Sequence, residues 1–159
     1  MDHKDKVQMK GWVNLKHFRQ GKLIEERDAH NTIQTVGIEK LAKFLTAEYT
    51  GSISHMGIGL NTGAQGDAPA LTTLDSEVSP TTGLASTTHT ILTSRSMTGA
   101  GIDTFVTTFT IGASVLAKEV GLFDASANGN MFARQQFAVL SLVATDTLQC
   151  TWTVTVIDT

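Results

Sequence analysis

The sequence is short of cysteine, proline, aromatic residues and charge. Its 159 residues include one cysteine and two prolines, with 6% aromatic and 17% charged residues, against roughly 25% charged residues in an average soluble protein. A single cysteine excludes an intramolecular disulfide, and one thiol without a signal peptide indicates synthesis in a reducing cytoplasm. No apolar run approaches the roughly 18 residues of a membrane-spanning helix, so we expect no membrane partner.

The sequence also lacks a dense block of lysine and arginine, so we expect no nucleic-acid partner. Charge is nevertheless unevenly distributed, because residues 1–50 carry nine Lys/Arg and seven Asp/Glu, whereas residues 51–159 carry three and eight. This asymmetry predicts a charged N-terminal arm or hairpin, residues 1–28, that can lie on an acidic neighbour. The rest of the chain, residues 29–159, is predicted to be a β-sandwich domain. A solvated hairpin followed by a helix is the alternative interpretation.

Threonine and alternating apolar residues are what the chain has in abundance. It contains 24 threonines, and in its last segment Leu148, Cys150 and Trp152 alternate with Gln149 and Thr151. A period of two with one apolar and one hydroxyl face is typical of a half-buried antiparallel strand, in which Cys150 is a small buried side chain. Strands are predicted on such patterns near 8–28 (a hairpin), 53–60, 84–97, 102–111, 115–123, 131–140 and 148–157. The predicted fold is therefore mainly β, an antiparallel β-sandwich or barrel of about eight or nine strands with one short helix.

Turn and cap signals separate these strands. Gln20-Gly21 predicts the turn of the first hairpin, Asn128-Gly129 predicts a type I′ turn, and Asp146 predicts the turn before the last strand. Helical spacing predicts a helix over about 36–48, capped by Thr35, whose apolar stripe must dock on a sheet. The members of that stripe are Ile38, Leu41, Ala42 and Leu45, with Phe44 beside them.

No motif of the sequence indicates a specific catalytic, cofactor or metal site. The five histidines lack metal-ligand spacing, and the acids of the loop over 61–83, Asp67, Asp75 and Glu77, lack the spacing of a calcium loop and are expected to be solvated. Glu119 and Arg134 are expected to be a weak, diagonal pair at best. We therefore predict no catalytic residue, no cofactor, no metal site and no enzymatic activity. A glycan-cleaving β-sandwich enzyme is a disfavoured alternative, since such domains use many aromatic side chains.

Several motifs resemble those of small virion proteins of tailed bacteriophages. The shared pattern is of the form E-x-G-L-F-(D/N)-A, then G-x-M-x-A-R, then T-W-T-(I/V)-x-V. It corresponds here to residues 119–125, 129–134 and 151–156, with further similarity at His30-Asn31-Thr32-Ile33 and over residues 58–63. Together these motifs extend over most of residues 30–157. They are packing and turn patterns, so the resemblance indicates kinship of fold more directly than role.

The resemblance implies a capsid decoration (cement) protein or a tail-associated protein. The first hypothesis is a virion protein on the capsid surface that binds the major capsid protein as a homotrimer and stabilises the head by multivalent contacts. The alternative is a tail or tail-fibre protein of host attachment, with loop 61–83 as its adaptable surface. The candidate partner-binding residues are Trp12 and Phe18 as anchors and Arg19 and Lys22 as charged contacts. Packing of Trp12 on its own domain is the competing interpretation.

Overall fold

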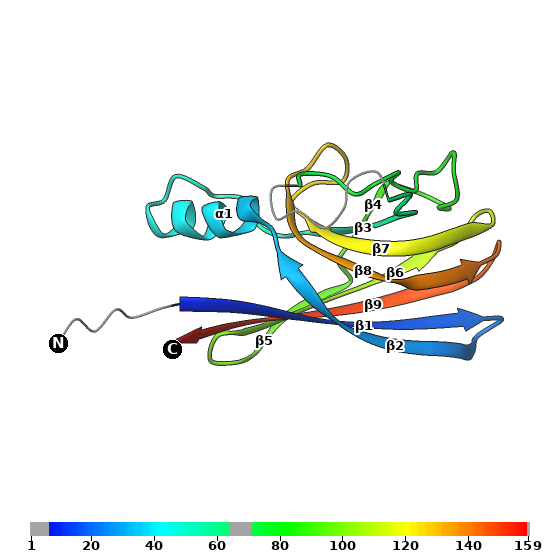
Figure 1. Cartoon of the computed structure of the whole chain (residues 1–159), viewed down its shortest axis with the longest axis horizontal. Coiled ribbons are helices and arrows are strands. Elements are labelled where there is room, and N and C mark those ends of the chain that lie inside the picture. The colour runs from blue at the N-terminus through cyan, green and yellow to red at the C-terminus, as the bar shows by residue number, and fades with distance from the viewer. Residues whose placement is uncertain (1–6, 64–70, 159) are drawn as a thin grey trace.

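The computed structural model describes residues 7–63 and 71–158 and shows a mainly β chain with nine strands and one helix (Figure 1). All strand pairs are antiparallel. The elements are β1 (Val7–Arg19), β2 (Lys22–Ile33), α1 (Thr35–Leu45), β3 (His55–Gly59), β4 (His89–Ile91), β5 (Ser94–Gly99), β6 (Ile102–Thr110), β7 (Val115–Phe123), β8 (Met131–Leu142) and β9 (Thr147–Asp158). The predicted fold class, strand number and single helix are confirmed.

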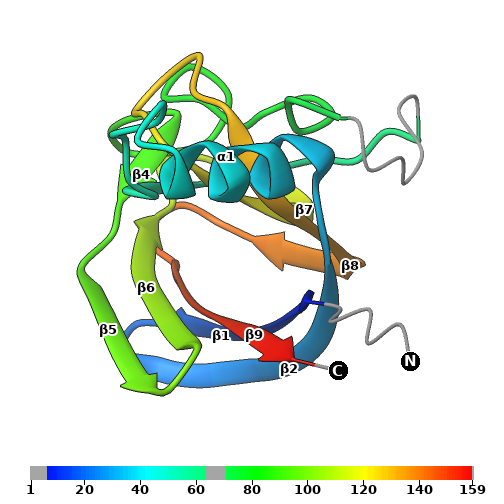
Figure 2. The same ribbon diagram turned by 90° about the vertical axis from the view of Figure 1, so that its left-hand side faces the viewer.

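The strands form two antiparallel sheets in a sandwich-like arrangement, visible from the side in Figure 1 and from one end in Figure 2. Sheet A contains β2, β1, β9, β6 and β5, and sheet B contains β4, β3, β7 and β8. The last residues of β2, Thr32 and Ile33, cross over to pair with Arg134 and Ala133 of β8. The strand order has two ends, β4 and β5, so the described strands do not close into a barrel.

The period of two in β9 places its apolar side chains in the core. Leu148, Cys150 and Trp152 are fully buried, whereas the intervening threonines are half-buried on the outer face of sheet A. Cys150 is inside the sandwich, where burial raises the pKa of its thiol. The prediction of a small buried side chain at Cys150 is confirmed, and the thiol is held in its protonated form.

The N-terminal hairpin, β1 and β2, forms part of sheet A. Its turn is formed by Gln20 and Gly21, which both have positive φ angles of 51° and 75°. Strand β1 pairs with β2 on one side and with β9 on the other, in a continuous register from Val7 opposite Asp158 to Phe18 opposite Thr147. The described part of the predicted arm therefore belongs to sheet A rather than extending away from it. Residues 1–6 lie outside the described residues.

The turn predicted at Asn128-Gly129 is wrong in detail. Asn128 has a positive φ of 52° but Gly129 does not, so the connection between β7 and β8 is not a two-residue type I′ turn. Residues 124–130 form a longer loop because the Asp124 carboxylate accepts hydrogen bonds from the backbone N–H and the side-chain amide of Asn130.

The predicted strand over 84–97 is also wrong, because the chain changes sheets within it. Leu84 makes only an isolated bridge to Ile111, and the strand character then divides into β4 at the edge of sheet B and β5 at the edge of sheet A. Residues Leu92 and Thr93 connect the two edges, with the Thr93 N–H bonded to the Val106 carbonyl. A local alternation pattern carries no information about such a change of sheet.

The helix begins and ends earlier than predicted. Its N-cap is Gln34, which makes no side-chain cap, and Thr35 is already helical. The Gln34 N–H donates to the Phe132 carbonyl of β8 at 3.0 Å, so tertiary structure decides where the chain leaves the sheet. The helix ends at Leu45 instead of near residue 48. With 11 residues, α1 is the only helix among the described residues and is too short and too polar to cross a bilayer.

Candidate functional site

Helix α1 lies across one end of the sandwich, above the first residues of β1 and the last residues of β9 (Figures 1 and 2). Its closest approach to sheet B is at Gly37, which is buried against Phe132 so tightly that an added Cβ would overlap the Phe132 carbonyl. Further along the helix, Lys40 forms an ion pair with Asp124, and its ammonium lies 4.0 Å from the centre of the Tyr49 ring. These contacts hold α1 along one side only.

The Asp124 carboxylate is the main polar anchor of the helix. It accepts hydrogen bonds from Lys40, from Asn130 and from the Tyr49 hydroxyl at 3.2 Å. Burial alone would raise the pKa of Asp124, but the hydrogen bonds from Lys40 and Asn130 bring that pKa below its usual value. The carboxylate is therefore ionised near neutral pH, and its charge is compensated by Lys40.

Between α1 and sheet A lies an apolar groove of about 280 Å³. Most of its lining is apolar, and the apolar side chains are those of Met9, Leu41, Phe44, Ile53, Phe105, Phe132, Val154 and Val156. A second hollow of about 390 Å³ adjoins the groove, because both are lined by Ser52, Ile53, Asp103 and Phe105. We call this end of the sandwich, with α1 and the two hollows, the open end.

The apolar stripe of α1 is largely exposed at the open end, contrary to the prediction that it docks on a sheet. Ile38 is 54% exposed and Phe44 is 62% exposed, while Leu41 is only half-buried. Across the hollows from the helix, Met97 is 75% exposed and Val156 is 37% exposed. Clustered exposed apolar side chains of this kind mark a protein-binding surface more often than a solvated one.

At the opposite end of the sandwich, a buried carboxylate and its hydrogen-bond partners connect the last turn between the two sheets to β1. Asp146, in the turn between β8 and β9, is fully buried and accepts two hydrogen bonds of 2.9 Å from the Arg19 guanidinium. The Val143 N–H donates to the same carboxylate at 2.9 Å, and His17 Nε2 lies 2.8 Å from it. The hydrogen bonds from Arg19 outweigh burial and, with those from Val143 and His17, hold the pKa of Asp146 well below its usual range. We call this the closed end.

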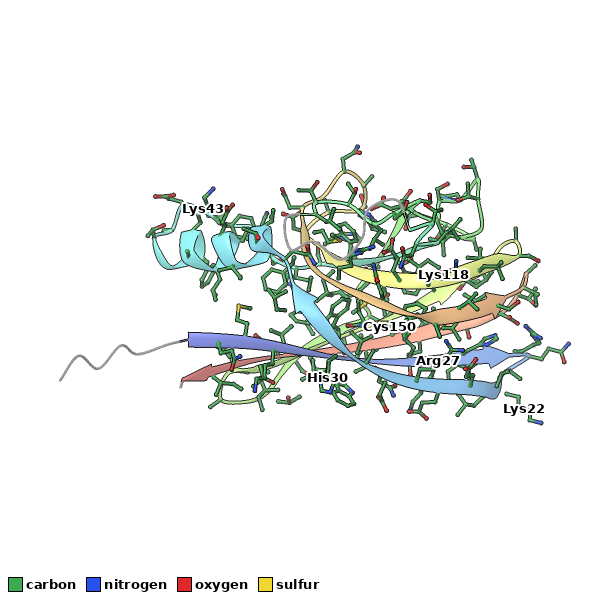
Figure 3. The ribbon with its side chains drawn as sticks, in the orientation of Figure 1. Lys22, Arg27, His30, Lys43, Lys118 and Cys150 are labelled. Carbon is green, nitrogen blue, oxygen red and sulfur yellow. The ribbon has the colours of Figure 1, made fainter. Side chains whose placement is uncertain are left out.

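The four predicted partner-binding residues do not form one surface. Lys22 is exposed at the tip of the β1–β2 hairpin (Figure 3). Arg19 is engaged with Asp146 and Phe18 is half-buried beside it, so these three residues lie at the closed end. Trp12 lies in the middle of β1 on the outer face of sheet A, where it is 41% exposed. The sequence identifies the apolar stripe of α1 but not its exposure, because the exposure depends on where the helix docks.

Glu119 and Arg134 form a buried ion pair beneath the loop that follows β3. Gly121 lies opposite Arg134 and Glu119 lies opposite Gln136, so the pair is diagonal, as the sequence predicts. It is not weak, however, because both side chains are almost fully buried and Arg134 Nε lies 2.7 Å from Glu119 Oε2. Burial raises the pKa of Glu119, and the interactions with Arg134 partly offset that rise. Each buried charge is thus neutralised by the other, across the neighbouring strands β7 and β8.

Within the long loop, the described segment 71–83 is packed on the sandwich. Leu74 and Val78 are buried, with no helical turn between them, and the Asp75 N–H donates to Glu119. Asp75 is 5% exposed, so the expectation of a solvated loop acid is wrong for this residue, whereas Asp67 lies outside the described residues. Within the described part of the chain, no group of three His, Cys, Asp or Glu side chains is arranged to hold a metal ion.

Comparisons with protein-family models, with curated protein sequences and with solved structures found no match.

Proposed function

We propose that the chain is a structural protein of a bacteriophage virion. In this proposal it is a capsid decoration protein that binds the major capsid protein on the outer surface of the head as a homotrimer. The observation that carries the protein-binding role is the exposed apolar surface of the open end, formed by Ile38, Phe44, Met97 and Val156. The resemblance of residues 119–134 and 151–156 to phage virion proteins supplies the context.

Burial of the open end is the physical basis of the proposed contact. Fully burying one large apolar side chain contributes about 1.5–3 kcal/mol, so covering three or four half-exposed ones yields a useful but modest interaction. A homotrimer presents three such surfaces to the capsid, and once the first has bound the others bind at high effective concentration. Weak individual contacts of this kind can hold neighbouring capsid subunits together against internal pressure.

The buried charges of the fold support a structural rather than a catalytic role. Glu119 is compensated by Arg134, Asp146 by Arg19 and Asp124 by Lys40. Each carboxylate is engaged in fastening two segments of the chain to one another. We therefore propose no enzymatic activity.

The proposal is tested by the double variant Ile38→Ser, Phe44→Ser. Purified protein is added to virions that lack it, and the bound fraction is measured by co-sedimentation. We expect binding to weaken at least about tenfold, because two central apolar contacts are lost. The matched control is Leu116→Ser, an equally exposed apolar residue (57%) at the start of β7, away from the open end.

Two outcomes would contradict this function. Equal binding of the double variant and the control would remove the open end as the contact surface. Cryo-EM of virions with and without the protein supplies the second test, by locating the protein on the head or on the tail. If omission leaves the head equally resistant to heat while host adsorption fails, the protein is a tail protein of host attachment instead.

A further inference from the structure

The outer face of sheet A, which points away from sheet B, divides into two chemically different halves. Strands β9, β6 and β5 contribute a surface of small, uncharged side chains, which we call the hydroxyl floor. Its central members are Thr151 and Thr153 on β9, Thr104 and Val106 on β6, and Ser94 and Ser96 on β5, which are adjacent in register. Strands β1 and β2 contribute the charged half of the face.

Trp12 stands at the boundary between the two halves. It lies directly opposite Thr153 on one side and His30 on the other. Trp12 is 41% exposed whereas Thr153 and Thr104 are half-buried, so the indole rises above the floor beside it. Figure 3 shows His30 on this outer side of the sheet. The other tryptophan, Trp152, is fully buried in the core.

The indole of Trp12 is held in a fixed orientation from the side of β2. Its Nε1–H donates to Asp28 Oδ1 at 3.1 Å, and the edge of the ring meets His30 at a centroid distance of 4.4 Å and an interplanar angle of 88°. Asn14 Nδ2 donates to the same Asp28 oxygen at 3.0 Å and to Glu26 at 2.8 Å. The indole thus gains its polar partner within the protein, and its position is established before any ligand binds.

The charges of this face balance one another. Lys10 and Lys16 on β1 lie on the same side of the sheet as Glu26 and Asp28 on β2, and Lys16 is 3.5 Å from Glu26. The face therefore carries no net charge to attract an anionic or cationic ligand. A hydroxyl surface also offers little to an apolar peptide, for which the open end is far better suited.

We propose that Trp12 and the hydroxyl floor form a binding site for a neutral saccharide. A sugar ring has an apolar C–H face that stacks on an exposed indole, and its hydroxyls pair with threonine hydroxyls, which both donate and accept. The fixed indole supplies the stacking surface, and Thr153 and Thr104 lie next to it to receive the ring hydroxyls. This site is independent of the open end, and it makes the protein a saccharide-binding module in addition to its proposed role in assembly.

The experiment titrates the full chain with four soluble neutral probes: a glucan, a mannan, a galactan and an N-acetylglucosamine oligomer. Tryptophan fluorescence reports binding, because Trp12 is exposed and the buried Trp152 gives a constant background. We expect at least one probe to bind with a Kd of about 1 mM or tighter, and alginate, an anionic polysaccharide, to bind at least about tenfold more weakly.

Variants then connect binding to the site, with calorimetry as the readout for those that lack Trp12. Trp12→Ala is expected to weaken binding at least about tenfold, and Thr153→Val, which removes one hydroxyl at nearly constant shape, about threefold. Phe44→Ser at the open end is the matched control and is expected to bind as the wild type does. Denaturation midpoints verify folding, and Thr153→Val, together with Trp12→Phe, carries the test if Trp12→Ala does not fold.

The proposal is overturned if none of the four probes binds at about 10 mM sugar, or if alginate binds best. It is equally overturned if Trp12→Ala and Thr153→Val bind as tightly as the wild type, or if Phe44→Ser weakens binding as much as they do. If Trp12→Ala instead abolishes binding to virions, the face is a protein interface and not a saccharide site.

Discussion

The two ends of the sandwich differ in chemistry: one is held together by a buried carboxylate, and the other is partly covered by an apolar helix. At the closed end, a buried carboxylate, Asp146, joins the β8–β9 turn to β1 through Arg19 and His17. At the open end, a helix covers an apolar groove incompletely and leaves Ile38 and Phe44 exposed. The Asp146 carboxylate at the closed end has all its hydrogen-bond partners within the same chain.

This difference indicates which part of the molecule is available to a partner. A buried, fully hydrogen-bonded carboxylate stabilises its own fold and offers nothing to a second molecule. An exposed apolar stripe contributes little to the stability of its own chain but gains free energy when a partner covers it. We therefore expect substitutions at the closed end to lower the stability of the fold, and substitutions at the open end to weaken partner binding.

The largest effect on the free energy of unfolding is expected when two single variants are compared, in each of which one phenylalanine is replaced by alanine. Phe109→Ala, in the core opposite Leu148, is expected to lower the free energy of unfolding by about 4 kcal/mol, because it leaves a cavity. Phe44→Ala at the open end should cost less than about 1 kcal/mol, since that ring is already 62% exposed. Urea denaturation at neutral pH measures both. A loss of similar size in Phe44→Ala would mean that the open end is as well packed as the core.

The next effect is expected from Asp146→Ala at the closed end. The substitution leaves the Val143 N–H, the buried His17 and part of Arg19 without their acceptor, which should cost about 2–3 kcal/mol. Asp103→Ala serves as the matched control, because Asp103 is an exposed acid at the open end. Denaturation midpoints compare the two, and equal midpoints would show that the closed end does not depend on this carboxylate.

A smaller and more local effect is expected from Gly37→Val in α1. The added side chain collides with the Phe132 carbonyl, so the helix must move away from β8 at a cost of about 2 kcal/mol. Amide hydrogen exchange is expected to accelerate in α1 while the strands remain protected. Ala42→Val, at an exposed position of the same helix, controls for the introduction of a β-branched residue. Unchanged exchange in Gly37→Val would contradict the one-sided attachment of the helix.

The smallest effect is a dependence of the closed end on pH. The pKa of Asp146 is lowered on folding from an ordinary value of 3.8, so its contribution to stability is fully present above that value and is lost as pH falls below it. The stability difference between the wild type and Asp146→Asn should therefore narrow between pH 7 and pH 3. Measuring the difference cancels the opposite contribution of Glu119, whose pKa is raised by burial. A constant difference would show that folding does not lower the pKa of Asp146.

The candidate surfaces were only partly predictable from the sequence. Trp12 was identified as a possible contact from its residue type, but its orientation depends on Asp28 and His30, which lie across a hairpin from it. Arg19 was expected to contact a partner, yet it binds Asp146, more than a hundred positions away in the chain. The diagonal register of Glu119 and Arg134 predicts a weak pair, but the loop that covers them buries both side chains, and the sequence does not show that cover.

The sequence alone predicts the mainly antiparallel fold and the faces of most strands, because a period of two in side-chain polarity is a local property of each segment. It placed Trp152 and Cys150 inside the core and the threonines of β9 on the outer face. Contacts in three dimensions are needed to show which end of the sandwich Asp146 closes and how far α1 lies from the sheets. Helix docking and buried ion pairs depend on the distance between segments remote in sequence, and no local periodicity encodes that distance.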